Sequence, residues 1–365
     1  RPMIKKCIFI VLIGVISLSY GKGVLRIAGW GGEIPNQVFK AFEKKHHVKV
    51  YFSSFESNES LDVKLRTSKK SIYDLIMPSS YYIPRLIQSD LLQRLKLENI
   101  PAEKLINPVF KPDEINNQYS IPLNWSSTAI FYNKKYIQHP PQHWQDLWSL
   151  EYKNQVLLLD DTREVFSIAL IALGYTPNDE NPEHIQKAYS KLLKLRSNIK
   201  LFASDAVPNL MIDEDALIGM AWSADIIKAQ TENPNIGFVL PKEGYIINTE
   251  SFAIPKNAEN VSSAYAFINF MLAPENLLLM VSKNHFPPTI PAKYLELPID
   301  LKDNPILFPQ EKILKSAILQ KNVSHIIDFG KCLNYRYRTN RCSKKFYVLI
   351  LKPYLILKTP KKFMK

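Results

Sequence analysis

Short apolar strands alternate with helices in the N-terminal part of this chain, and the alternation restricts the fold more than any other feature of the sequence. The hydrophobic spacing predicts strands at 24–28, 48–52 and 73–77 and helices at 35–43, 62–67 and 83–92. A helix in each connection is typical of parallel strands, because a parallel crossover is too long for a tight turn. The predicted fold class is therefore α/β, and 365 residues are enough for two domains.

Between residues 157 and 166 an apolar run leads directly into a group of acidic residues. The three leucines at 157–159 predict a buried strand, and Asp161 is placed to cap the helix that follows. Asp161 and Glu164 then lie three residues apart on the first helical turn, so both carboxylates can face one point in space. This arrangement favours a cationic ligand. The alternative is an ordinary capping box, in which Glu164 reaches back to its own helix start and Arg163 pairs with a neighbouring acid.

Aromatic and acidic side chains follow several other predicted strands. Ligands of open α/β sheets bind beyond the carboxyl ends of the strands, so side chains that follow different strands can meet there. A single aromatic residue at such a position more often belongs to the core, but five such strand ends favour a shared cleft. The residues at these strand ends are Trp30, Ser79, Tyr81, Asp161, Glu164, Trp222 and Glu250.

The positive charge of the chain is concentrated at its two ends. The formal net charge is +13, but residues 331–365 carry eleven Lys and Arg side chains and no acid, and residues 1–22 carry four more. Residues 23–330 are therefore slightly acidic, with a net charge of −2. Nucleic-acid-binding domains carry a basic surface, so we expect no nucleic-acid partner for the main body. A mildly negative body suits a cationic ligand.

The N-terminal residues have the pattern of a secretory signal peptide. Two lysines precede an apolar run at 8–18, and the small residues Ser19 and Gly21 follow it. We expect residues 1–21 to be removed by cleavage after Gly21 and the protein to be exported to the periplasm. The run is short for a membrane span, and an uncleaved membrane anchor is the alternative.

The sequence lacks the common motifs of catalysis. It contains no Gly-rich phosphate loop, no Gly-x-Ser-x-Gly and no His-Glu-x-x-His pattern. Its seven histidines have no cysteine partners at zinc-ligand spacing. We therefore expect a protein that is not an enzyme and that holds no cofactor or metal. An exported hydrolase with Asp161 and Glu164 as acid and base is the alternative, but no nucleophile accompanies these residues.

Six motifs follow one another along the chain between about residues 24 and 325. They are Glu56-Ser57-Asn58-Glu59, Pro78-Ser79-Ser80-Tyr81-Tyr82, Tyr119-Ser120-Ile121-Pro122, Asp160-Asp161-Thr162-Arg163-Glu164-Val165-Phe166, Gly219-Met220-Ala221-Trp222 and Phe252-Ala253-Ile254-Pro255. Together they resemble the periplasmic spermidine/putrescine-binding proteins of bacterial polyamine ABC transporters. The resemblance implies a two-lobed periplasmic-binding-protein fold of type II, with a polyamine in the interlobe cleft. It also implies delivery to an inner-membrane ABC permease with a cytoplasmic ATPase.

The resemblance further implies which residues line the polyamine site. Aromatic rings would clamp the methylene chain, where each cation–π contact contributes roughly 0.5–2 kcal/mol. Carboxylates would hold the ammonium groups through charge-assisted hydrogen bonds. The implied clamp is Trp30, Trp222 and Tyr81, the implied carboxylates are Asp161, Glu164 and Glu250, and Ser79, Phe286 and Gln320 complete the set.

Several positions depart from the family pattern. The family usually has Trp, then Thr or Ser, an acid and Tyr, whereas this chain reads Trp-Gly-Gly-Glu at 30–33. Glu33 either supplies a new carboxylate to the site or caps the helix that begins near Pro35. Asn248-Thr249-Glu250 replaces the usual second clamp Trp and pocket Asp, and Phe286 stands where a Tyr is usual. The preference between spermidine and putrescine is therefore open.

The resemblance divides the chain into two lobes, with strand crossings expected near 128–131 and 249–254. A sensor that binds polyamine and signals to a membrane receptor would have the same lobes and the same pocket, and it is the alternative to a transport receptor. The basic tail, with Cys332 and Cys342, does not resemble the family. The expected divisions are a signal peptide at 1–21, lobe 1 at 24–129 plus 250–296, lobe 2 at 130–249 plus 297–330, and the tail at 331–365.

Overall fold

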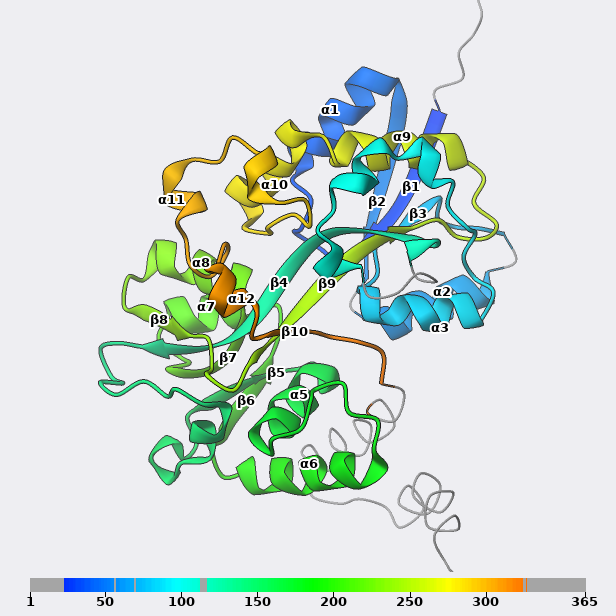
Figure 1. Cartoon of the computed structure of the whole chain (residues 1–365). Helices are drawn as coiled ribbons and strands as arrows, with labels where there is room; N and C mark the ends of the chain where they lie inside the picture. The colour runs from blue at the N-terminus through cyan, green and yellow to red at the C-terminus, as the bar shows by residue number, and fades with distance from the viewer. Residues whose placement is uncertain (1–22, 56, 69, 112–116, 324–325, 327–365) are drawn as a thin grey trace, which may run out of the picture.

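The computed structural model describes residues 23–55, 57–68, 70–111, 117–323 and 326, and its elements are labelled in Figure 1. The predicted signal peptide at 1–21 lies outside these ranges. The basic tail at 331–365, with Cys332 and Cys342, also lies outside them.

The predicted N-terminal strands form one parallel edge of the sheet, and helices connect them. The elements are β1 (Gly23–Gly29), α1 (Asn36–His46), β2 (Val48–Ser54), α2 (Asn58–Thr67), β3 (Leu75–Ile76) and α3 (Ile83–Gln88). β1 pairs in parallel with both β2 and β3, so the predicted alternation is confirmed here. α2 begins earlier than predicted because the Ser57 hydroxyl caps it, accepting a hydrogen bond from the Ser60 backbone N–H at 3.1 Å.

A second group of parallel strands forms the opposite edge of the sheet. Its elements are β5 (Val156–Leu159), α5 (Thr162–Ala172), α6 (Pro182–Leu195), β6 (Ile199–Ala203), α7 (Val207–Ile212), β7 (Ile218–Trp222), α8 (Ser223–Glu232) and β8 (Ile236–Val239). β5 lies between β6 and β7 and runs parallel to both. All four residues of β5 are buried, as the apolar run predicts.

Two long antiparallel strands, β4 (Ser120–Asn133) and β9 (Tyr245–Ala253), join the two edges. Figure 1 shows them running diagonally between the two groups of helices. Within the described residues the order of strands is β2-β1-β3-β9-β4-β7-β5-β6, and β8 pairs with β4. The parallel pairing that the alternation predicts therefore holds at both edges, whereas the centre of the sheet is antiparallel.

The C-terminal elements return the chain from one lobe to the other. They are α9 (Val261–Met271), α10 (Pro274–Asn284), α11 (Ile299–Lys302), α12 (Glu311–Leu314) and β10 (Ala317–Leu319), which pairs in parallel with β9. Short 3-10 helices lie at η1 (Ser80–Tyr82), η2 (Leu97–Asn99), η3 (Pro101–Leu105), η4 (Pro108–Phe110), η5 (Trp144–Trp148), η6 (Leu150–Tyr152) and η7 (Ala292–Tyr294). In the described ranges no single helix is long and apolar enough to cross a membrane, although α9 and α10, bent by 70°, meet those criteria as a pair.

Each lobe has a large apolar core of its own, and the long strands contribute to both. In β4, Leu123 belongs to the first core and Ala129 to the second. In β9, Ile246 belongs to the second core and Phe252 to the first. The few residues between these positions pass from one lobe to the other, so their side chains are placed beside both lobes at once.

Candidate functional site

Asp161 and Glu164 occupy the N-terminus of α5, directly after β5. Asp161 is the helix cap, and its Oδ1 accepts a hydrogen bond from the Glu164 backbone N–H at 3.0 Å. Glu164 does not reach back to complete a capping box, because its carboxylate accepts hydrogen bonds from Thr128 Oγ1 at 2.8 Å and from Asn248 Nδ2. The capping alternative is therefore right for Asp161 and wrong for Glu164, which faces the central strands.

Arg163 does not pair with a neighbouring acid, so that part of the capping alternative is wrong. Its Nη1 donates to Ser167 Oγ at 2.7 Å and to the Pro177 carbonyl at 2.9 Å. Its Nη2 donates to Asn178 Oδ1 at 2.8 Å and to the Lys321 carbonyl at 3.0 Å. Burial lowers the pKa of Arg163 to about 10. The guanidinium thus fastens the segment after β10 to α5 through neutral acceptors and leaves the nearby carboxylates without an ion pair.

Glu250, on β9, is held by residues from the first lobe. Trp30 Nε1, after β1, donates to Glu250 Oε2 at 2.8 Å, and Ser79 Oγ, after β3, donates to Glu250 Oε1 at 3.2 Å. Asn58 Nδ2 donates in turn to Ser79 Oγ at 3.2 Å and to Tyr81 Oη at 3.1 Å. The structure therefore brings Trp30, Ser79, Tyr81 and Glu250 into one hydrogen-bonded group. Asn58, which links Ser79 to Tyr81, belongs to the first of the six motifs, but the sequence did not predict it as a site residue.

Glu33 belongs to the same side of the site and does not cap a helix. α1 begins after Pro35 and has no side-chain cap. The Glu33 side chain is buried, 6% exposed, and its Oε2 accepts a hydrogen bond from Asn124 Nδ2 at 3.1 Å. Asn124 lies on β4, opposite Glu250 on β9. Of the two alternatives for Glu33, the structure therefore supports an added carboxyl and contradicts a helix cap.

Glu33, Asp161, Glu164 and Glu250 form an acidic set, called the carboxyl chain below, in which Glu33 and Glu164 are buried and Asp161 and Glu250 are partly buried. Burial raises the pKa of Glu33 to about 8 and that of Glu164 to about 7, and it also raises the pKa of Asp161 and Glu250. Glu33 and Asp161 further raise the pKa of Glu250, and Asp161 raises that of Glu164. No lysine or arginine of the described ranges forms an ion pair with any of the four.

Trp222, Phe286 and Gln320, the remaining predicted site residues, contact the two cores or α5. Trp222 ends β7 and packs against the second core, and Phe286 packs against the first. Gln320 is 4% exposed, and its Nε2 donates to Ser167 Oγ at 3.4 Å. The Oε1 atom of Gln320 is buried without a hydrogen-bond partner, as is Oδ1 of Asn248. Of these two unpartnered acceptors, the one on Asn248 belongs to a side chain that contacts the carboxyl chain, at Glu164.

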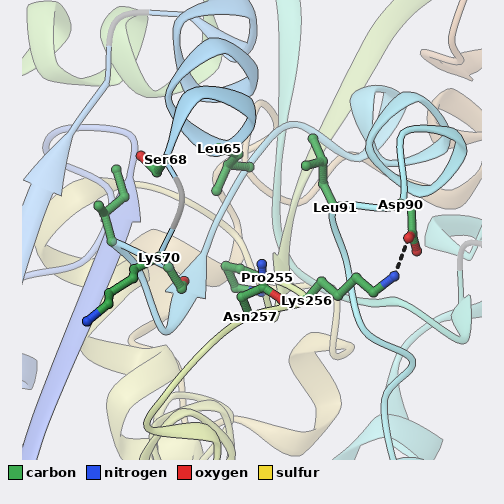
Figure 2. A pocket seen from close by; sticks show the side chains of 10 residues that line it. Leu65, Ser68, Lys70, Asp90, Leu91, Pro255, Lys256 and Asn257 are labelled. Atoms are coloured by element: carbon green, nitrogen blue, oxygen red, sulfur yellow. Dashed lines mark hydrogen bonds and ion pairs between the residues drawn. The ribbon is translucent and has the colours of Figure 1, made fainter.

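Two cavities on the described part of the surface, of about 40 and about 220 Å³, are lined by no member of the carboxyl chain. Figure 2 shows one of about 40 Å³, lined by residues of both α2 and the loop after β9, with Lys256 paired to Asp90 across it. Ligand pockets are usually several hundred cubic ångströms, and the cavity in Figure 2 is much smaller. In the part of the chain that the structure describes, no group of His, Cys, Asp or Glu side chains is arranged to hold a metal ion.

The two lobes, the antiparallel strands that join them and the polar residues between them define the class of two-lobed solute-binding proteins. The chain belongs to the bacterial extracellular solute-binding proteins, whose family model matches residues 37–309. The resemblance that the six motifs indicate is thereby confirmed at the level of the family.

Relatives and solved structures agree with this assignment. The spermidine/putrescine-binding periplasmic protein of Escherichia coli is 35% identical over 298 residues, which are 80% of this chain and 85% of that protein. The spermidine/putrescine-binding periplasmic protein 1 of Haemophilus influenzae is 34% identical over 304 residues, which are 82% of this chain and 84% of that protein. A spermidine/putrescine ABC transporter protein from Listeria monocytogenes superposes with a TM-score of 0.80 at 30% identity, covering 87% of this chain and 100% of its own. The spermidine/putrescine ABC transporter substrate-binding protein PotD from Streptococcus pneumoniae superposes with a TM-score of 0.76 at 32% identity. The match covers 88% of this chain and 100% of that structure.

The raised pKa values predict how stability varies with pH in the absence of ligand. Glu33 and Glu164 have pKa values of about 8 and about 7 in the folded protein, against an ordinary value of 4.5. The folded state therefore binds more protons than the unfolded state, and the free energy of unfolding should fall as pH rises from about 4.5 to about 8. Urea unfolding across this pH range measures the slope. The double variant Glu33→Gln, Glu164→Gln should show a smaller slope, and an unchanged slope would contradict the assignment of these pKa values.

Proposed function

We propose that this protein is a periplasmic binding protein that captures a polyamine and delivers it to an ABC permease of the inner membrane, driven by a cytoplasmic ATPase. The carboxyl chain is the observation that carries the proposal. Glu33 and Glu164 are buried, Asp161 and Glu250 are partly buried, and the four come from both lobes. No lysine or arginine of the described residues forms an ion pair with them. Burying carboxylates without an opposite charge is unfavourable, so a cationic ligand would relieve a cost that the unliganded protein bears.

The carboxyl groups of the carboxyl chain are coupled in series, which suits a ligand that carries several separated positive charges. Electrostatic coupling links Glu33 to Glu250, Glu250 to Asp161, and Asp161 to Glu164. A polyamine carries ammonium groups separated by a few methylenes, and each ammonium can meet one member of such a series. A compact metal ion would instead need several ligands around one point.

Aromatic residues beside the carboxyl chain suit the methylene segments of the same ligand. Trp30 is fixed by its hydrogen bond to Glu250 and by edge contact with Phe55, with ring centroids 4.7 Å apart. Trp222, at the end of β7, is proposed as the opposite side of the clamp, with Tyr81, Phe286 and Gln320 completing the site. The relatives whose names specify spermidine and putrescine support this choice of ligand.

The two apolar cores support a division into lobes that closes around the ligand by hinge motion. The proposed lobe 1 comprises 24–129 plus 250–296, and the proposed lobe 2 comprises 130–249 plus 297–330. The change of core within β4 and within β9 supports crossings in those strands. The N-terminal pattern and the periplasmic relatives support export, with removal of residues 1–21.

Calorimetric titration of the full chain with spermidine, spermine and putrescine tests the proposed ligand class. We expect micromolar or tighter binding, which corresponds to about −8 kcal/mol. Lysine is the control, because it carries an ammonium group together with a carboxylate of its own. Absence of heat with all three polyamines, from protein shown to be folded, would contradict the proposal.

A further inference from the structure

The C-terminal half of α6 carries a group of basic side chains. Lys191 and Lys194 lie three residues apart on the helix, so both can project from the same side of it. Burial lowers the pKa of Lys191, and the neighbouring charge of Lys194 lowers it further. Arg196, at the end of the helix, is exposed. None of the three forms an ion pair with an acidic residue of the described ranges.

The 3-10 helices η5 and η6 lie beside this half of α6. Trp148 Nε1 donates a hydrogen bond to the Lys191 carbonyl at 3.0 Å, and Lys191 Nζ lies 4.6 Å from the centre of the Trp148 ring. The side-chain amide of Asn198, just after α6, donates to the Ser149 carbonyl at 2.7 Å. These contacts hold the start of η6 against the end of α6.

η6 adds one apolar and one basic side chain to this surface. Leu150, its first residue, is 80% exposed, more than any other large apolar side chain of the described ranges. Lys153 follows η6 and is exposed, and the next residue, Asn154, donates its backbone N–H to the Ser197 carbonyl at 2.9 Å. Glu151 is also exposed here, so four basic residues accompany one acid. The name α6 basic face is used below for Leu150, Lys153, Lys191, Lys194 and Arg196.

We propose that the α6 basic face binds an anionic phospholipid membrane, with Leu150 entering the lipid and the four basic side chains contacting phosphate groups. Peripheral membrane-binding surfaces combine apolar anchors with Lys and Arg side chains. The exposed leucine gains by leaving water, and the cations gain from phosphates because no acid of the described ranges pairs with them. Protein interfaces are depleted in lysine. Since three of the four cations are lysines, the composition favours a membrane over an acidic protein.

The α6 basic face is separate from the carboxyl chain. α6 packs against α5, and Figure 1 shows it farther than α5 from the long strands β4 and β9. Binding to a membrane through this face would therefore leave the interlobe site accessible. The inference does not depend on which ligand that site takes.

Co-sedimentation of the full chain with phospholipid vesicles tests the proposal. We expect binding to vesicles of phosphatidylcholine mixed with phosphatidylglycerol, and much weaker binding to vesicles of phosphatidylcholine alone. The triple variant Lys191→Gln, Lys194→Gln, Arg196→Gln should reduce partitioning onto the mixed vesicles about tenfold or more, because each cation near an anionic surface contributes to binding. Absence of binding by the unmodified protein would overturn the proposal.

The triple variant Lys40→Gln, Lys44→Gln, Lys45→Gln is the matched control. These lysines are exposed on α1 in the first lobe, so the control loses the same charge at a different surface. It should change partitioning by less than about threefold, because surface charges act over about a Debye length. Both variants keep the basic ends of the chain, whose contribution is then the same in each. Equal losses in the two variants would show that net charge alone matters and would overturn the α6 basic face.

Leu150→Ser tests the lipid as partner. It removes no charge, and it should reduce partitioning at least about threefold, because an apolar side chain no longer enters the membrane. Unchanged partitioning in Leu150→Ser would overturn the membrane in favour of a soluble polyanion. Calorimetry with spermidine should give the same affinity for Leu150→Ser as for the unmodified protein. Failure of both to bind spermidine would count against the proposed function and leave the membrane result standing.

Discussion

Glu164→Gln should lower polyamine affinity by about 2 kcal/mol or more, roughly 30-fold, without lowering the stability of the unliganded protein. The glutamate is 1% exposed and has no ion pair, so removing its charge takes away a cost of folding at neutral pH. The hydrogen bonds can be kept. Thr128 can still donate to the new amide oxygen, and the unpartnered Oδ1 of Asn248 can accept from the new amide nitrogen after a side-chain flip.

Calorimetry and urea unfolding at neutral pH measure the two halves of this prediction separately. Glu98→Gln, at an exposed site outside the carboxyl chain, removes one surface charge and serves as the matched control for a change in net charge alone. Unchanged affinity in Glu164→Gln would remove this residue from the ligand site. A large loss of stability would instead mean that the carboxylate is chiefly structural, and that the capping turn of α5 depends on its charge.

Gly219→Ala should destabilise the second lobe by about 3 kcal/mol, the upper end of the usual cost of overpacking. Gly219 on β7 lies opposite Leu157 on β5, and a Cβ atom there would lie 2.2 Å from the Leu157 carbonyl oxygen. A backbone atom of a central, buried strand cannot move aside as the end of a flexible side chain can. β5, which leads to Asp161, and β7, which ends at Trp222, would have to separate, so ligand affinity should fall with stability.

Urea unfolding of Gly219→Ala checks the size of this effect. Gly31→Ala is the control, because a Cβ at Gly31 would meet no atom closer than 3.8 Å, at Ser54. We expect the control to change the free energy of unfolding by less than about 0.5 kcal/mol, as for most surface substitutions. Equal stabilities of the two variants would show that the β5–β7 pairing tolerates a wider spacing than the structure indicates.

Much of this protein could be predicted from local patterns in the sequence. The spacing of hydrophobic residues predicted the alternation of strands and helices in the N-terminal part of the chain. It also predicted the buried strand before Asp161. The polar and aromatic residues at strand ends were expected to lie close together, and Trp30, Ser79 and Glu250 do form one hydrogen-bonded group. These features depend on a few neighbouring residues, so the order of residues along the chain is sufficient to reveal them.

Only the tertiary structure decided the directions of the acidic side chains. A local pattern cannot distinguish a Glu164 that caps its own helix from one that faces Thr128 and Asn248, which lie 36 and 84 residues away in sequence. Glu33 likewise depends on Asn124, 91 residues away. These partners lie on β4 and β9, whose antiparallel pairing at the centre of the sheet brings distant segments together. Their positions are set by packing between the lobes, which no short stretch of sequence specifies.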